Sequence, residues 1–369
     1  MVADTLKNMI LPPEIFTIVS DYLSLRDISS LVLTCREVNR WVDMNDVIRE
    51  YYLVNRRKER NPLEDACQYG YVNLLMYLHR TKTRMQGGLI ALASQYGHLD
   101  IVKYLCSVGD DPTAGDNYPI RWASYNGHLA VVEYLYSVGA DPTALNNYAI
   151  IWASKHGHLS VVEYLCTVGA DPTANDNNPI RYASEFGHLP VVKYLYSVGA
   201  DPTANNNAPI RWAIMNGHLS VVEYLYSVGA DPTADGNYAI AQASNRGYVD
   251  VMKYLHSIGV DLVGVHNTPL KHACREGHLP VVQYLCSIGA NPTAEDNTPL
   301  NLACREGHLP VVKYLCSIGA DPKAGDNSPI KLACHNGHFP VVKYLYSIGA
   351  DPRADDNVLQ YLRTCKSRH

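Results

Sequence analysis

The chain repeats itself with a period of thirty residues, and this repetition constrains its fold more than any other feature. The stretch GHLPVVKYLCSIGADP (307–322) follows GHLPVVQYLCSIGANP by thirty residues and precedes GHFPVVKYLYSIGADP by thirty more. The glycine that opens each copy recurs at Gly97, Gly127, Gly157, Gly187, Gly217, Gly247, Gly277, Gly307 and Gly337. A degenerate first copy has its glycine at Gly70, so about ten units occupy residues 61–356. Units of this length form elongated arrays in which each unit packs against its neighbours.

Each unit contains two segments in which apolar residues have helical spacing. In the unit that begins at residue 116, Ile120, Ala123 and Ser124 share one face of a short helix that Gly127 ends. The second helix carries Leu129, Val132, Leu135 and Val138. Pro119 suits a first helical turn, and in three units the residue before this proline is a predicted N-cap: Thr268, Thr298 or Ser328. Asp141-Pro142 then leads into an extended, protruding loop. Such a helix pair cannot bury its apolar face alone, so we expect the units to stack.

The histidine and cysteine in each unit raise the question of a metal or catalytic site. Four cysteines share one phase of the period and three share another: Cys106, Cys166, Cys286 and Cys316, then Cys274, Cys304 and Cys334. Tyr136 and His256 fill the first phase elsewhere, and Ser124 fills the second. Because these replacements cannot supply a sulfur ligand or a disulfide, and no CxxC pair occurs, we predict reduced cysteines with packing roles. No hydrolase, P-loop or zinc-protease motif is present, so we expect no metal, no cofactor and no enzyme activity.

Composition limits the class of protein further. An apolar fraction of 47% with 18% charged residues is too hydrophobic for a disordered chain, and the net charge of −5 disfavours general nucleic-acid binding. The N-terminus lacks a secretory signal pattern, and no run of eighteen apolar residues could span a membrane. We therefore expect a soluble cytoplasmic protein with no membrane partner, and a nuclear location is the second possibility.

The repeated motif resembles a known family. The stretch TPLKHACREGHLPVVQYLCSIGANP (268–292) is similar to an ankyrin repeat, whose pattern runs T-P-L-H-x-A-A-x-x-G-H-x-x-V-V-x-x-L-L-x-x-G-A-D. The period departs from the family value of about 33 residues, because three residues are missing from the hairpin tip. The family histidine after T-P-L is also replaced throughout, for example by Arg121 and Lys271. The resemblance predicts an all-α ankyrin-repeat solenoid, built of helix-turn-helix units with short hairpin loops.

Two polar residues recur in the framework of the array. One asparagine recurs at the same place every thirty residues from residue 117 onward: Asn117, Asn147, Asn177, Asn207, Asn237, Asn267, Asn297, Asn327 and Asn357. Asparagine tolerates positive φ and hydrogen-bonds its own backbone, so it suits a tight turn, and a stacked ladder of asparagines between loops is the alternative. His308 and its equivalents follow the helix-ending glycine, and we predict that they orient the turn between the two helices.

The segment before the repeats lacks the thirty-residue pattern, and its apolar spacing predicts three or four short helices. Its plainer interpretation is a helical cap on the array, which a solenoid needs to cover its first apolar face. It also resembles an F-box, through Leu11, Pro12, Glu14, Ile15, Ile18, Leu23, Asp27, Ile28, Leu31, Cys35 and Arg36. Trp41 stands later than the family aromatic, and Val47-Ile48 replaces the usual Leu-Trp pair. The resemblance implies docking to the Skp adaptor of cullin–RING ubiquitin ligases. The predicted organisation is an F-box-like domain (1–55), a linker (56–60), the array (61–356) and a C-terminal cap or tail (357–369).

The first helix of each unit presents a second face opposite its core. In ankyrin arrays this face lines the concave groove, and the two residues before each glycine are the least repeated part of this sequence. A constant framework with a varying face is what partner selection requires. The predicted partner-binding groove is aromatic in the middle and basic toward the C-terminus, and a protein with acidic and apolar groups would fit it. Its residues are Tyr118, Arg121, Trp122, Tyr125, Trp152, Lys155, Arg181, Tyr182, Arg211, Trp212, Met215, Lys271, Arg275, Arg305 and Lys331. The alternative is that Trp122, Trp152 and Trp212 only pack between helices.

Three functions remain open from the sequence. The first is a substrate receptor that links a captured protein to a Skp–cullin ubiquitin ligase. The second is a plain ankyrin scaffold whose N-terminal helices only cap the array. The third, nucleic-acid binding along the groove, is disfavoured because Glu185, Glu276 and Glu306 interrupt the basic stripe. The layout is similar to ankyrin proteins of large DNA viruses that infect amoebae, which would place the protein in the host cytoplasm.

Overall fold

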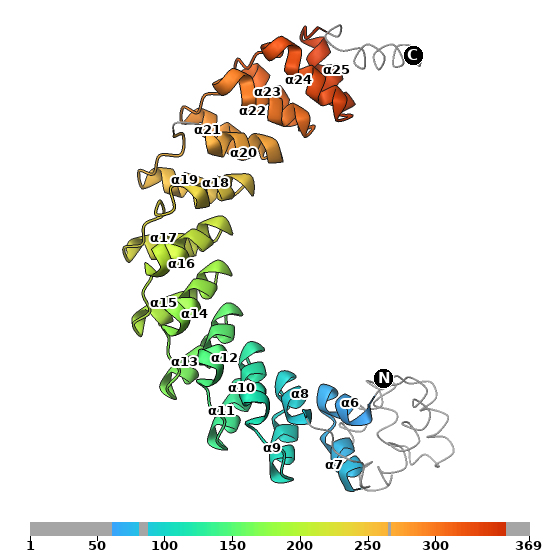
Figure 1. Ribbon diagram of the computed structural model, residues 1–369, viewed down its shortest axis with the longest axis vertical. Helices are drawn as coiled ribbons and strands as arrows, with labels where there is room; N and C mark the ends of the chain where they lie inside the picture. Colours follow the sequence, from blue (N-terminus) through green and yellow to red (C-terminus); the bar gives the residue numbers. More distant parts are fainter. Residues whose placement is uncertain (1–60, 81–87, 265–266, 352–369) are drawn as a thin grey trace, which may run out of the picture. The chain divides into compact units, whose positions relative to one another are not determined.

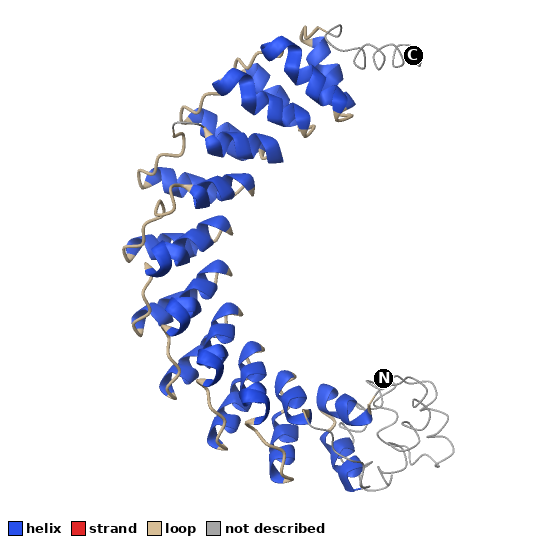
Figure 2. Cartoon of the chain, viewed as in Figure 1, coloured by secondary structure: helices blue, strands red, loops and turns tan. Residues whose placement is uncertain are grey.

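All the regular structure that can be described in this chain is helical. The computed structural model describes residues 61–80, 88–264 and 267–351, and within these ranges it contains α-helices and no strand (Figure 2). The all-α solenoid prediction is therefore confirmed for the repeats. The F-box-like residues from Leu11 to Cys35, the linker 56–60 and the tail 357–369 lie outside the described residues.

The helices belong to two compact units, Met1–Asp111 and Pro112–His369. The first contains α6 (Pro62–Tyr69), α7 (Val72–Arg80), α8 (Leu89–Gln95) and α9 (Leu99–Ser107). The second contains α10 (Ala114–Tyr125), α11 (Leu129–Ser137), α12 (Ala144–Lys155), α13 (Leu159–Thr167), α14 (Ala174–Glu185), α15 (Leu189–Ser197), α16 (Ala204–Met215), α17 (Leu219–Ser227), α18 (Tyr238–Asn245), α19 (Val249–Ser257), α20 (Thr268–Glu276), α21 (Leu279–Ser287), α22 (Ala294–Arg305), α23 (Leu309–Ser317), α24 (Ala324–His335) and α25 (Phe339–Ser347).

In the second unit the helices form two parallel rows. The even-numbered helices, the first of each repeat, pack side by side from α10 to α24, and the odd-numbered helices do the same from α11 to α25 (Figure 1). Each first helix also packs against the second helix of its own repeat. The main contacts in this unit thus run within a repeat and between successive repeats, as expected of a solenoid. None of the described helices has the length and apolar character that crossing a membrane would need.

Apolar side chains from both helices make a continuous core between the repeats. In the repeat of α10 and α11, Ile120, Ala123, Val132 and Leu135 are fully buried, and the same positions are buried in the repeats that follow. Burying a side chain of this size stabilises the fold by roughly 1.5–3 kcal/mol. Val138, which the helical spacing placed on this face, is 38% exposed, because α11 ends at Ser137 and the chain turns away there.

One small polar position lies inside this core. Ser124, Ser154, Ser184 and Ser244 are fully buried, and the equivalent Cys274 and Cys304 replace them toward the C-terminus. Burial raises the pKa of both thiols, so they stay protonated and unreactive near neutral pH. All eight cysteines of the described residues are free thiols. Cys67, Cys274 and Cys304 are buried in the core and the other five are half-buried, which agrees with the predicted packing role.

The turn between the two helices of a repeat ends on the recurrent glycine. Gly127 has a φ of 79°, and the next backbone N–H, that of His128, donates to the carbonyl of Ala123 at 2.9 Å. This left-handed glycine followed by a bond back into the helix is a common way to end an α-helix. The predicted end of the first helix at Gly127 is confirmed.

The loop between repeats is a short left-handed turn, and the predicted extended loop is wrong. Gly115, Asp116 and Asn117 fall within the bounds of α10 but are not in a right-handed helix, because all three have φ near +60°. The right-handed helix begins after them. The N–H of Asn117 closes the turn by donating to the carbonyl of Thr113 at 2.9 Å. The same three-residue turn recurs in five other repeats, at 145–147, 175–177, 205–207, 295–297 and 325–327. A tip this compact accounts for a period of thirty residues.

This turn also changes where the first helix begins. Pro119 falls in the first right-handed turn, as predicted, because the residues before Tyr118 are left-handed. The N-cap predictions for Thr268 and Thr298 are wrong: Asn267 occupies the cap of α20 without a side-chain bond, and Thr298 Oγ1 donates to the carbonyl of Glu295. At α20 the left-handed Asn267 takes the N-cap position that the sequence had predicted for Thr268.

The recurrent asparagine connects each loop to the next. Asn117 Oδ1 accepts a hydrogen bond from the backbone N–H of Asp141 at 2.7 Å, and Asn147 accepts one from Asp171 at 2.8 Å. The same bond recurs at Asn177, Asn207, Asn297 and Asn327. Both interpretations of this residue are thus partly right, since it adopts positive φ and also forms a ladder. Its side chain bonds the following loop and not its own backbone, and Asn357 lies outside the described residues.

Candidate functional site

The exposed side of the even-numbered helices in the second unit carries every residue of the predicted groove. We call this surface the first-helix face; it comprises the outward residues of α10, α12, α14, α16, α18, α20, α22 and α24. Tyr118 is 44% exposed and Arg305 is exposed, whereas the remaining groove residues are half-buried. Some groove residues contact aromatic rings and others pair with carboxylates. The face therefore divides into an aromatic part and a charged part.

The aromatic part spans α10 and α12. Trp122 packs between Tyr118 and Tyr125, at 5.6 and 5.1 Å between ring centroids. Tyr125 reaches across to the next repeat, 5.3 Å from Trp152 and 4.1 Å from His156. Trp122 and Trp152 therefore do pack between helices, yet both keep part of their surface exposed. Half-exposed Trp and Tyr side chains held rigidly by neighbours are typical of binding hot spots.

Three cations on α10, α12 and α14 lie over aromatic rings. The Arg121 guanidinium lies 5.2 Å from the centroid of Tyr118, and the Arg181 guanidinium lies 3.9 Å from that of Tyr182. Lys155 Nζ lies over Trp152 at 4.6 Å, with two further rings within 6 Å of it. Cation–π contacts of this kind contribute about 0.5–1 kcal/mol at exposed sites. They also hold long basic side chains in one place on the surface.

Basic residues farther along the face have carboxylate neighbours. The pairs are Arg181–Glu185 at 3.3 Å, Arg211–Asp235 at 3.6 Å, Lys271–Glu295 at 2.6 Å, Arg275–Glu276 at 3.0 Å, Arg305–Glu306 at 2.8 Å and Lys331–Asp326 at 2.8 Å. Such surface pairs add little stability, typically below about 1 kcal/mol, but they reduce the charge that a ligand meets. The C-terminal part of the face is therefore less basic than its count of Lys and Arg indicates.

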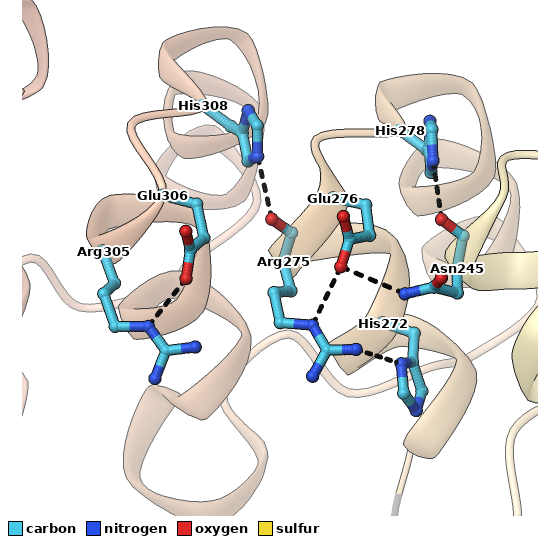
Figure 3. Close-up of polar contacts among 8 residues, drawn as sticks. All are labelled: Asn245, His272, Arg275, Glu276, His278, Arg305, Glu306 and His308. Atoms are coloured by element: carbon cyan, nitrogen blue, oxygen red, sulfur yellow. Dashed lines mark hydrogen bonds and ion pairs between the residues drawn. The ribbon is translucent and has the colours of Figure 1, made fainter.

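Figure 3 shows how these charges are tied into the repeat framework. Glu276 Oε1 accepts from Arg275 Nε at 3.0 Å and from the Asn245 amide at 3.1 Å. A second Arg275 nitrogen donates to Nδ1 of His272 at 2.8 Å, which requires a neutral imidazole. Burial and the charge of Arg275 both lower the pKa of His272, in agreement with that bond. This charged cluster is a fixed network, and it joins α18 to α20.

The framework histidines have the structural role that the sequence predicted, but their rings bond the backbone of the preceding repeat, which the prediction of a turn-orienting residue did not include. His278 Nε2 donates to the carbonyl of Asn245 and His308 Nε2 to that of Arg275, both at 2.8 Å (Figure 3). These carbonyls belong to the ends of the preceding first helices, so each ring joins two repeats. Within the described residues, no group of three or more His, Cys, Asp and Glu side chains is placed to hold a metal ion.

The comparison with family models agrees with this architecture. The model described as ankyrin repeats (3 copies) matches residues 63–146, 120–206, 210–296 and 289–356. The chain belongs to the ankyrin repeat family. A search of the curated proteins finds no match to this chain. Ankyrin repeats are in general non-enzymatic scaffolds that bind protein partners, and the exposed first-helix face is where this chain's repeats differ most.

Three residues that directly follow the first helices also contribute to this surface and were not selected from the sequence. His156 contributes to the aromatic part, and Phe186 lies beside Lys155. Arg246 reaches back one repeat to donate to the carbonyl of Met215 at 2.8 Å and to Asn216 Oδ1 at 2.7 Å. All three stand directly before a recurrent glycine, among the least repeated positions of the sequence. Their variability was the signal that could have identified them.

Proposed function

We propose that this ankyrin protein is an adaptor whose first-helix face captures one protein while its segment 1–55 docks to the Skp adaptor of a cullin–RING ubiquitin ligase. The observation that carries the first half is the run of half-exposed rings around Trp122 and Trp152, held in place on an otherwise constant framework. Rigid aromatic side chains supply contact area at low entropic cost, which favours a protein partner.

The second half rests on the F-box-like pattern of the sequence. Leu11, Pro12, Glu14 and Ile15 begin it, and Leu31 and Cys35 close it. The remaining members of the set are Ile18, Leu23 and Ile28. Apolar residues in this arrangement suit a helical surface that binds another helical protein. We place the activity in the cytoplasm, where the free cysteines of the repeats would remain reduced.

The pairing of charges on the first-helix face argues against nucleic acid as the partner. Arg181, Arg275 and Arg305 each have a carboxylate within 3.3 Å, so few cations are left to neutralise phosphates. A nucleic-acid surface gains its affinity by releasing counterions from several phosphates at once. A protein partner with mixed apolar and polar groups fits the paired surface better.

The test is affinity purification of three forms of the protein: the intact chain, a chain that lacks residues 1–55, and the Trp122→Ala, Trp212→Ala double variant. We expect the intact chain to recover Skp and cullin subunits together with a captured protein. The truncated chain should lose only the ligase subunits, and the double variant only the captured protein. If neither the intact nor the truncated chain brings down a Skp–cullin subunit, the ligase role fails and the plain scaffold remains. Circular dichroism establishes that the double variant is folded.

A further inference from the structure

A small hollow opens on the first-helix face between α12 and α14. It has a volume of about 80 Å³ and is lined by Tyr148, Ile151, Trp152, Lys155, Asn175, Asn178 and Tyr182. The lining is aromatic and aliphatic apart from two amides and one ammonium group. A hollow of this size accommodates one side chain of a partner and not a whole small molecule, since ligand pockets usually exceed about 300 Å³.

One cation stands at the hollow and is surrounded by rings. Lys155 Nζ lies 4.6 Å from the centroid of Trp152, 5.6 Å from that of Tyr182 and 5.2 Å from that of Phe186. These three rings come from two successive repeats, so the ammonium group is fixed between α12 and α14. The rings shield one side of the ammonium group from water. Its three N–H donors form no hydrogen bond to any described residue.

Lys155 differs from the neighbouring basic residues because its charge is not paired with a carboxylate. Arg181, which lies 3.9 Å from the centroid of the same Tyr182 ring, is neutralised by Glu185 and also donates to Asn178 Oδ1 at 2.8 Å. The basic residues from Arg211 to Lys331 in the predicted groove have carboxylate neighbours as well. Among the groove cations that the structure describes, only Arg121 and Lys155 have no carboxylate, and Arg121 instead donates to the carbonyls of Gly115 and Asp116. Lys155 is thus the cation left for an outside anion.

The histidine next to Lys155 does not add a second positive charge to the site. His156 is the next residue, and its Nε2 is buried without a hydrogen-bond partner in the structure. Burial, together with the charges of His158, Lys155 and His188, lowers the pKa of His156. The neutral form of His156 is therefore favoured, and Lys155 supplies the positive charge of the site. Glu185, a carboxylate of α14, is paired with Arg181 at 3.3 Å.

We propose that the hollow between α12 and α14 binds an acidic peptide segment of the partner. A partner carboxylate accepts hydrogen bonds from Lys155, and an adjoining aliphatic or aromatic side chain enters the hollow against Trp152 and Tyr182. Charge complementarity selects the carboxylate, and the apolar lining selects its neighbour. This inference rests on the proposed role of the first-helix face and names the chemistry of the partner that it would capture.

The experiment selects peptides from a random dodecapeptide library displayed on phage, with the full chain as bait. Wild type should enrich Asp or Glu next to an aromatic or aliphatic residue. Lys155→Glu should enrich Lys or Arg at that position, because the charge that it presents is reversed. For a synthetic copy of the selected peptide, Lys155→Met should weaken binding by about tenfold or more, since a charge-assisted bond is lost. Binding should also raise the pKa of His156, measured by NMR, because a carboxylate has come close.

A matched control is available on the row of odd-numbered helices. Lys193 on α15 also lies over a ring, 5.5 Å from the centroid of Tyr224, but it is outside the first-helix face. Lys193→Glu should select the same peptides as wild type. The inference is overturned if wild type and Lys155→Glu enrich the same sequences, or if wild type enriches no acidic residue.

The outcomes separate this inference from the proposed function. Peptides that are lost in Trp212→Ala but unchanged in Lys155→Glu would show that the face binds proteins elsewhere, which removes the acidic subsite alone. Peptides that are insensitive to both substitutions, or the absence of any enriched peptide, would remove both the subsite and the face as a peptide-binding surface.

Discussion

His188 and Lys155 join two successive repeats through one hydrogen bond. His188 Nε2 donates to the backbone carbonyl of Lys155 at 2.9 Å, across 33 residues of sequence. The same imidazole fills the space above Gly157, where a Cβ would lie 2.5 Å from Nδ1. Gly157 also has a φ of 77°, so two independent constraints exclude a side chain there. The recurrence of Gly-His in the sequence thus reflects contacts between repeats as well as a turn within each one.

Substitution of His188 separates the two parts of this contact. Tyr248 takes the histidine's place in one repeat and packs its ring over Gly217, so His188→Tyr should keep the packing and lose only the bond. We expect His188→Tyr to lower the free energy of unfolding by about 1 kcal/mol and His188→Ala by roughly 2–3 kcal/mol. Urea unfolding followed by circular dichroism measures both. His335, which is exposed, is the control, and equal losses for the two His188 variants would rule out this division.

The stability of the array should decrease at mildly acidic pH. Burial is the main cause that lowers the pKa of His156, His188 and His272 below the usual 6.5. Because the folded state binds protons less readily than the unfolded state, these histidines stabilise the fold above about pH 6.5. That contribution is lost as the pH falls from there through the folded-state values. Urea unfolding at about pH 8 and about pH 5 measures it, and the His156→Gln, His272→Gln double variant should depend less on pH. An unchanged dependence in that variant would contradict the assignment.

The asparagine ladder offers a comparison between two asparagines at equivalent positions of the repeat. Asn147 accepts the N–H of Asp171, whereas Oδ1 of Asn267 is buried without a partner in the structure. Glycine tolerates the positive φ of both positions, so replacing each asparagine by glycine isolates the side-chain bond. We expect Asn147→Gly to cost about 1 kcal/mol more than Asn267→Gly in the free energy of unfolding. Equal effects would mean that the ladder bond contributes nothing, and hydrogen exchange of the Asp171 amide provides an independent measurement.

The helical part of the fold could be predicted because it depends on local patterns. Ile120, Ala123 and Leu135 show their burial through spacing alone, and Gly127 ends its helix as expected. The loop could not be predicted, because three successive left-handed residues are rare in L-amino-acid chains and no spacing rule indicates them.

The candidate site was predicted only in part for a related reason. The sequence shows which side chains belong to the face, but not which carboxylate pairs with which cation. Lys271 and Glu295 are 24 residues apart and lie 2.6 Å from each other, a pairing that depends on how the repeats stack. That Lys155 has no carboxylate partner could therefore not be predicted from the sequence, because it depends on where the carboxylates of the other repeats lie.

Leu145 is the clearest strained position of the array. It is the first residue of a left-handed turn, with φ 52° and ψ 50°, and its side chain is 46% exposed. An aliphatic residue in this conformation costs roughly 1–2 kcal/mol, whereas asparagine tolerates it, as Asn175 does in the next repeat. Leu145→Asn should therefore raise the free energy of unfolding by about 1 kcal/mol, and Asn175→Leu should lower it by at least as much. Val138→Asn is the control, since this valine is similarly exposed but has a negative φ of −104°. If Leu145→Asn has no effect, or if Val138→Asn stabilises equally, the gain cannot come from relief of backbone strain.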